Sequence, residues 1–280
     1  MFIFSLLSGI AFDRISDDLR IILENGRPGA SSKELLRTYI SFLDLTFTSG
    51  SEDSSGVKLL CDKMNLLNEK GARLPAAVCV YPAFVALAKH ALMETPVKVA
   101  AFAGANHGVM PRSVKMEEIR FAAGEGADEV EVPLSHETFL AGEYHKLFRE
   151  LDTMREHAGR LTLKVILETN GLNTLEIVAK SCEIAIEAGA DFICAGSAGN
   201  GLPVNMESIF VILQVIREHH RKTGKKIGIK TWSIHSDLSV FPDYLFLVKE
   251  VLGEDWLNPG LCRFGTSVLS GPDIEKLLYI

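Results

Sequence analysis

The feature that most constrains the fold of this chain is a repeated alternation of short apolar segments with amphipathic helical segments. Eight segments have the length and the Val, Ile, Leu and Phe content of buried strands: 42–45, 76–80, 97–102, 129–132, 161–167, 191–194, 226–230 and 262–265. Helical patterns such as 84–93, 115–123, 147–157, 175–188 and 206–219 lie between them, and a last helix is expected from Pro272. Strand-helix alternation pairs strands in parallel through right-handed crossovers. The sequence therefore predicts an α/β fold, a (β/α)8 TIM barrel.

Two helices are expected before the first strand. One is capped by residues 16–18 and stops at Gly26, and the other opens with an S-x-x-E capping box at 31–34. We expect one domain over 1–280, in which 1–40 form a helical extension that closes the lower end of the barrel and 41–280 form the barrel. Residues 50–56 are polar and are expected to form a functional loop. A doubly wound sheet is the alternative, but the G-x-G-x-x-G turn that it needs is absent.

Composition excludes several classes of function. The net charge of -7 and the pI near 5.7 argue against nucleic-acid and membrane partners, which need a basic face. The one dense basic run, 222–226, is expected to be a solvated loop. Five cysteines without a C-x-x-C pair predict neither a disulfide framework nor a metal site, and they favour a reducing, cytoplasmic location.

The first twelve residues are apolar, like the core of a signal peptide. They lack a basic start and a small-x-small cleavage site, so we expect them to be retained. No later stretch approaches the roughly 18 to 20 apolar residues that a membrane span needs.

Short motifs along the chain resemble, in the same order, those of one enzyme family. They are DLT at 44–46, AAVCVYP at 76–82, GADEVEV at 126–132, LKVILET at 163–169, AGADFI at 188–193, GIK at 228–230 and RFG at 263–265. In these motifs the chain is similar to deoxyribose-phosphate aldolases, which are class I aldolases, over roughly 42–270. The resemblance implies a TIM barrel without cofactor or metal.

The resemblance also implies a catalytic site, and this chain departs from it at the central residue. The family forms an imine with substrate through a lysine at the end of the sixth strand, where this chain has Cys194, and a thiol cannot form an imine. Lys230 matches the neighbouring lysine of the seventh strand that lowers the pKa of the imine-forming amine. Glu131 matches a relay aspartate, and its added methylene extends the head group by about 1 to 1.5 Å.

We therefore expect an inherited but inactive site of Cys194, Lys230, Glu131 and Lys164. Glu131 is either a relay group or a carboxylate paired with Lys164 or Lys230, since buried charges must pair. By strand alternation, Glu168 shares the face of Lys164. Cys194 either fills the space of a lysine or forms a thiolate whose pKa Lys230 lowers.

The phosphate site that the resemblance implies is degenerate. Gly265, Thr266, Ser267 and Ser233 match its remaining donors. Trp232 and Ile234 replace small residues after the seventh strand, and Gly199, or Asn200 if the loop shifts by one, replaces a loop lysine. We expect the family's C-terminal tail to be missing, because 277–280 follow directly after the last expected helix. We expect weak phosphate binding at most.

Three functions remain open at this point. The first is an aldolase homologue without activity that binds a partner, with a protein as the expected partner and a weakly held small phosphate or a homodimer as further options. The second is an active carbon-carbon lyase that uses Lys230 or Lys164. The third is a non-covalent enzyme for small carbonyl compounds or sugar phosphates, with Glu131 and Lys230 as base and electrostatic partner.

Overall fold

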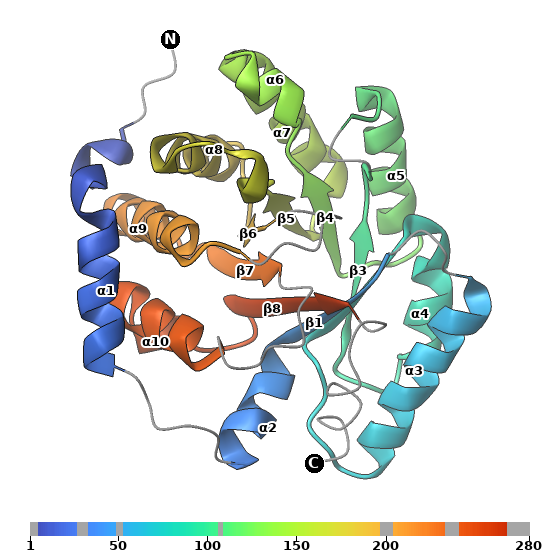
Figure 1. The fold of residues 1–280 in the computed structure, drawn as a ribbon. Coiled ribbons are helices and arrows are strands. Elements are labelled where there is room, and N and C mark those ends of the chain that lie inside the picture. The colour runs from blue at the N-terminus through green and yellow to red at the C-terminus, as the bar shows by residue number, and fades with distance from the viewer. Residues whose placement is uncertain are drawn as a thin grey trace.

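Eight parallel strands close into a barrel in this computed structural model. The model describes residues 5–26, 33–48, 53–105, 109–196, 204–232 and 241–267. The strands are β1 (Leu43–Phe47), β2 (Ala77–Val80), β3 (Lys98–Phe102), β4 (Glu129–Pro133), β5 (Thr162–Ile166), β6 (Phe192–Ala195), β7 (Gly228–Trp232) and β8 (Cys262–Ser267). Each strand pairs with the next and β8 pairs with β1, so the predicted (β/α)8 barrel is confirmed (Figure 1).

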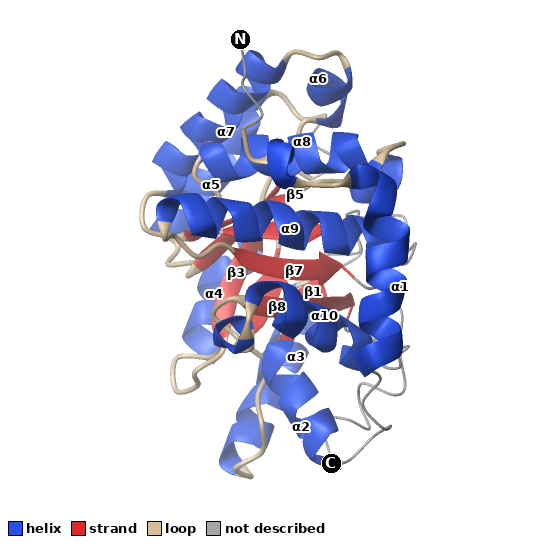
Figure 2. Cartoon of the chain, turned by 90° about the vertical axis from the view of Figure 1, so that its left-hand side faces the viewer, coloured by secondary structure: helices blue, strands red, loops and turns tan. Residues whose placement is uncertain are grey.

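Helices surround this ring. They are α3 (Ser54–Glu69), α4 (Val85–Ala91), α5 (Arg112–Gly124), α6 (His136–Leu140), α7 (Tyr144–Ala158), α8 (Leu175–Glu187), α9 (Met206–Thr223) and α10 (Phe241–Leu252). The side view shows strands inside and helices outside (Figure 2). Outward-facing strand residues such as Leu45, Val130 and Ile193 are buried under the helices. Because side chains alternate between the two faces of a strand, these apolar residues form a layer between the strands and the helices. None of the described helices is long and apolar enough to span a membrane.

Two helices precede the barrel, as predicted: α1 (Ile15–Gly26) and α2 (Lys33–Phe42). The expectation that both close the lower end of the barrel is wrong for α1, which lies outside the helix ring against α9 and α10 (Figure 1). Ile15 and Leu19 are buried there, because α1 is amphipathic and needs an apolar surface. On α2, the ring of Tyr39 packs 4.4 Å from that of Phe241 on α10 and 5.6 Å from that of Phe264 on β8, centroid to centroid.

Some predicted boundaries need correction. Residues 54–56 belong to α3 and not to the predicted loop, because Asp53 caps this helix by accepting from the Gly56 amide at 2.8 Å; residues 50–52 lie outside the described residues. Strand β7 starts and ends two residues later than predicted, and its first ladder bond runs from the Gly228 amide to the Asp191 carbonyl at 2.8 Å. The helix expected from Pro272 lies outside the described residues.

Candidate functional site

Four neighbouring strands place the predicted site residues in the barrel interior. Glu131 on β4 is the register partner of Lys164 on β5, and Cys194 on β6 is the partner of Lys230 on β7. Alternation along each strand turns these side chains away from the helices. All four residues are fully buried. The structure therefore brings the predicted residues together, while their chemical roles remain predictions.

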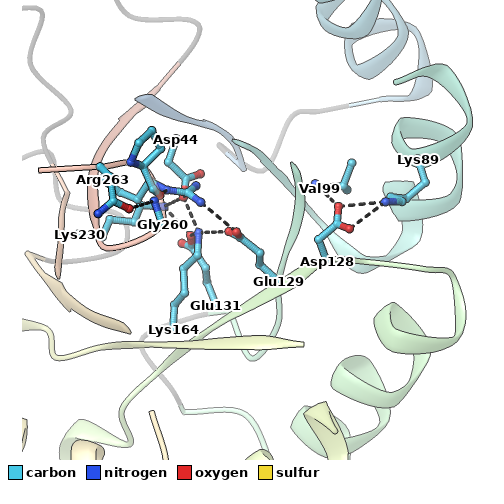
Figure 3. Close-up of polar contacts among 12 residues, drawn as sticks. Asp44, Lys89, Val99, Asp128, Glu129, Glu131, Lys164, Lys230, Gly260 and Arg263 are labelled. Carbon is cyan, nitrogen blue, oxygen red and sulfur yellow. Dashed lines mark hydrogen bonds and ion pairs between the residues drawn. The ribbon is translucent and has the colours of Figure 1, made fainter. Parts of the chain in front are cut away.

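The two lysines share the same carboxylates (Figure 3). Lys164 Nζ lies 3.0 Å from Glu131 Oε1, 2.5 Å from Asp44 Oδ2 and 2.5 Å from Glu129 Oε2. Lys230 Nζ lies 2.5 Å from Glu131 Oε1 and 3.1 Å from Asp44 Oδ2. The geometry therefore matches the interpretation of Glu131 as a carboxylate paired with lysine, and Glu131 contacts both lysines rather than one.

Three further residues complete the network, and the sequence analysis did not select them as site residues. Asp44 on β1 and Glu129 on β4 supply carboxylates, and Arg263 on β8 supplies a cation. Arg263 Nη2 lies 3.0 Å from Glu129 Oε1, and Arg263 Nη1 lies 3.8 Å from Asp44 Oδ2. The sequence did carry a signal for them, because all three are charged residues within apolar strands and fall in the family motifs.

The network is balanced in charge, with three cations and three carboxylates. Its members are between 0% and 4% exposed, so each charge depends on its partners for stabilisation. Below it, the ring of Phe192 lies 5.9 Å from Lys164 Nζ and 5.8 Å from the guanidinium carbon of Arg263. A Cβ on Gly228 would lie 2.4 Å from that ring, so glycine is required at this position.

Pairing outweighs burial in setting the protonation of this network. Burial by itself would lower the pKa of Lys164, but Asp44, Glu129 and Glu131 raise it well above its usual value. Burial also opposes the charged form of Lys230, and Asp44 and Glu131 again raise its pKa. Burial would raise the pKa of Asp44, but Lys164 and Lys230 bring it below its usual range. Both lysines are therefore ammonium ions.

Cys194 is a buried thiol between apolar side chains and the charged network. It belongs to a small interior cluster with Cys79, Ala100, Phe102 and Ile166. Burial, followed by the charge of Glu131, raises the pKa of Cys194 despite Lys230 and Lys164. This direction is opposite to the one that the thiolate interpretation requires, so the geometry favours the interpretation of Cys194 as a space-filling residue. All five cysteines are free and buried.

Glu168 does not continue the alternation of β5. The strand ends at Ile166, and Glu168 has a left-handed backbone with φ 54°, so strand parity no longer determines its direction. The predicted common face with Lys164 therefore does not follow. Asp44 and Glu129 supply additional carboxylates to the network.

The structure describes three of the four predicted phosphate donors, and all three lie in the last strand. Gly265, Thr266 and Ser267 belong to β8 and not to a loop after it, and they pair with 44–46 of β1. Likewise, Thr231 and Trp232 belong to β7. Ser233 and Ile234, with Gly199 and Asn200, lie outside the described residues. A phosphate site therefore stays a prediction. No three His, Cys, Asp or Glu side chains in the described ranges are grouped to hold a metal ion.

Known proteins similar in sequence to this chain are aldolases. A model described as DeoC/LacD family aldolase matches residues 38–221. Human deoxyribose-phosphate aldolase is 37% identical over 255 residues, a match that covers 86% of this chain and 79% of the human protein. The mouse enzyme is 36% identical over 254 residues, with the same coverage of both chains.

Solved structures agree on the fold. A Toxoplasma gondii protein provisionally assigned as a deoxyribose-phosphate aldolase superposes with a TM-score of 0.77 at 21% identity, covering 88% of this chain and 95% of its own. Deoxyribose phosphate aldolase from Aeropyrum pernix superposes with a TM-score of 0.62 at 19% identity, covering 93% and 96%.

Proposed function

Because the chain belongs to the DeoC/LacD aldolase family, we propose that it is an aldolase homologue without aldolase activity that acts by binding a protein partner. The observation that carries the proposal is Cys194, a buried thiol at the end of β6 where the family resemblance calls for the imine-forming lysine. Relatives named for deoxyribose phosphate suggest which reaction has been lost.

The chemistry of imine formation supports this proposal. A class I aldolase needs a neutral amine that attacks the substrate carbonyl, and the resulting imine then accepts the electron pair released by carbon-carbon cleavage. A thiol offers no nitrogen for this step. Substrate cleavage through Cys194 is therefore ruled out by its atoms, whatever the pKa of its thiol.

The remaining lysines do not replace the missing amine. Lys164 Nζ contacts three carboxylates and Lys230 Nζ contacts two. Their raised pKa values keep them protonated, and an ammonium ion has no lone pair with which to attack a carbonyl. These contacts argue against the alternative of an active lyase that uses Lys230 or Lys164.

One observation favours the non-covalent alternative. Glu131 Oε2 is buried and has no hydrogen-bond partner among the described residues, as is also true of Asp44 Oδ1. An unpaired carboxylate oxygen is what a base acting on a small carbonyl compound would need. This alternative predicts turnover without a covalent adduct, so it is separable from both of the others.

A cytoplasmic location is part of the proposal, and the five free, buried cysteines support it.

The test is borohydride trapping with 2-deoxyribose 5-phosphate and with acetaldehyde, read by intact mass and run beside human deoxyribose-phosphate aldolase as a positive control. We expect the control to gain a reduced adduct and this protein to gain none. An adduct mapped to Lys230 or Lys164 would overturn the proposal in favour of the active lyase. Acetaldehyde release without an adduct would favour the non-covalent enzyme.

A further inference from the structure

The end of α9 collects positive charge at the pole of the barrel opposite the β6 and β7 carboxyl ends. Helix α9 leads from the end of β6 back to the start of β7, so its last turns lie where the strands begin. Seven of the ten residues from 217 to 226 are basic or histidine. We call its five cations the α9 basic end: Arg217, Arg221, Lys222, Lys225 and Lys226.

These cations are exposed and only partly compensated. Arg221 Nη2 lies 2.8 Å from Glu218 Oε2, and Arg217 Nε lies 3.9 Å from Glu218 Oε1. Lys226 Nζ lies 2.9 Å from Asp255 Oδ2. Lys222 donates to a backbone carbonyl, and Lys225 makes no ion pair with any described residue. Glu218 and Asp255 pair with three of these cations, and the nearby Glu183 carboxylate interacts with Lys222, so the cations still outnumber the carboxylates by two on a chain whose net charge is -7.

The α9 basic end is held in a fixed shape. Gly224 ends the helix with a left-handed backbone at φ 71°, and its amide donates to the His220 carbonyl at 2.8 Å. The buried ring of Trp256 lies 5.0 Å from Lys226 Nζ and 5.0 Å from the His220 ring. Trp256 Nε1 donates to the Ile227 carbonyl at 2.9 Å. A surface that is already ordered loses little conformational freedom when a partner binds.

We infer that the α9 basic end is a docking surface for a short acidic segment of a partner protein. The inference names the partner chemistry for the binding role proposed above, and it rests on that role. Lysine and arginine pair with carboxylates through charge-assisted hydrogen bonds, and this excess of positive charge matches a few acidic residues. Because the surface lies at the opposite pole from Cys194, it does not depend on the inherited site.

The surroundings of the surface decide between a short acidic segment and a larger polyanion. Glu254 and Asp255 lie in a 3-10 helix (Glu254–Trp256) beside Lys226, and the rest of the chain is net negative. A membrane or a DNA duplex would extend beyond the cations and meet these carboxylates, since repulsion reaches about 8 to 10 Å at physiological salt. A narrow acidic chain can follow the cations alone.

The test is a fluorescence-anisotropy titration of the full chain with a labelled peptide of alternating glutamate and serine. One variant reverses two cations, Arg217→Glu with Lys225→Glu. The matched control makes the same charge change elsewhere, with Lys58→Glu on α3 and Arg73→Glu after it. We expect saturable peptide binding at about 50 mM salt. The affinity should fall about tenfold or more in the Arg217/Lys225 variant, and also in the unchanged protein at about 300 mM salt. In the control variant it should fall less than about twofold.

Three results would overturn the inference. The first is the absence of saturable peptide binding at low salt, and the second is an equal loss of affinity in the Arg217/Lys225 variant and in the control. The third is that phosphatidylserine vesicles or duplex DNA bind more tightly than the peptide, and that the Arg217 and Lys225 reversal abolishes this binding. Thermal melting of both variants establishes that they are folded. The borohydride experiment tests a different claim. If the protein forms a borohydride-reducible adduct and also binds the peptide, the proposed lack of aldolase activity is wrong, but the proposed docking surface still stands.

Discussion

The barrel interior and the α9 basic end are built from the same kinds of charged residue, yet they balance charge differently. Inside, three cations meet three carboxylates, and Lys164, Lys230, Asp44 and Glu131 are each 0% exposed. On α9, three of the five exposed cations form ion pairs with two carboxylates, of which Asp255 is exposed and Glu218 is buried. Water and salt screen an excess of charge at the surface, whereas a buried charge without a partner is destabilising. Burial, rather than residue type, imposes the balance.

This contrast gives a physical account of Cys194. A lysine at 194 would add a third amine, and a fourth potential cation, next to three carboxylates, and the excess positive charge would favour the neutral form of the new amine. The same imbalance would make it nucleophilic, as class I chemistry requires. With cysteine there, three cations and three carboxylates remain among the described residues of the network, so the charges can stay balanced without the nucleophile.

The largest expected effect comes from breaking the interior balance. Replacing Lys164 by Met leaves Asp44, Glu129 and Glu131 with only two cations. Removing one partner of a buried pair typically costs about 3 to 5 kcal/mol. We expect a loss of that size in the free energy of unfolding, measured by urea denaturation and followed by circular dichroism.

The matched control for Lys164→Met adds Glu129→Gln, which returns the interior to two cations and two carboxylates. We expect the double variant to recover part of the lost free energy. If Lys164→Met costs less than about 1 kcal/mol, the interior tolerates imbalance and the comparison with the surface does not hold.

The next effect concerns the protonation of an added amine. In Cys194→Lys, we expect a new lysine with a lowered pKa that forms an imine with acetaldehyde, trapped by borohydride and located by peptide mapping. We expect no return of family-level turnover, because Glu131 is one methylene longer than the family aspartate and a misplacement of about 1 Å in a catalytic group can cost on the order of 100-fold.

Adding Glu131→Asp to Cys194→Lys shortens the relay side chain and serves as the comparison. We expect it to raise acetaldehyde release from 2-deoxyribose 5-phosphate above that of the single variant. Full activity in the single variant would show that the length of Glu131 has no consequence, and failure to trap an imine in either would show that the added amine stays charged.

Much of this architecture could be predicted from the sequence, because it follows from local patterns. Alternating strand and helix segments gave the barrel, and strand parity with the family motifs gave Lys164, Lys230 and Glu131. Asp44 and Arg263 could not be placed in the same way. Their contacts with β4 and β5 cross the barrel, and strand tilt and stagger set such contacts, which no local pattern reports.

Some local rules do not reach beyond the element they describe. Strand alternation does not determine the direction of the Glu168 side chain, because β5 ends at Ile166 and the backbone of Glu168 is left-handed. Helix α1 was placed by its position in the chain, whereas its apolar face packs on α9 and α10. The basic run at 222–226 is exposed, as predicted, although Lys222 and Thr223 belong to α9 and the ring of Trp256 lies 5.0 Å from Lys226 Nζ.

A smaller effect is the pH dependence of the interior network. Paired with Lys164 and Lys230, Asp44 has a pKa below its usual 3.8 despite burial, so its contribution to stability is present above that value and falls as pH drops below it. The lysines have pKa values raised above 10.5, so their contribution is lost only as pH rises beyond that. We expect urea unfolding free energies to decline below about pH 4, with a smaller decline in Asp44→Asn. Equal declines would exclude Asp44 as a source of the acid sensitivity.

The smallest expected effect tests the surface side of the comparison. Lys225 is exposed and makes no ion pair with a described residue, so replacing it by Met removes a charge that solvent already stabilises. We expect the free energy of unfolding to change by less than about 0.5 kcal/mol, measured by the same urea denaturation as for Lys164→Met. The two substitutions are chemically identical and differ in burial and pairing. A loss at Lys225 that approaches the loss at Lys164 would mean that the α9 basic end, too, depends on a closed set of partners.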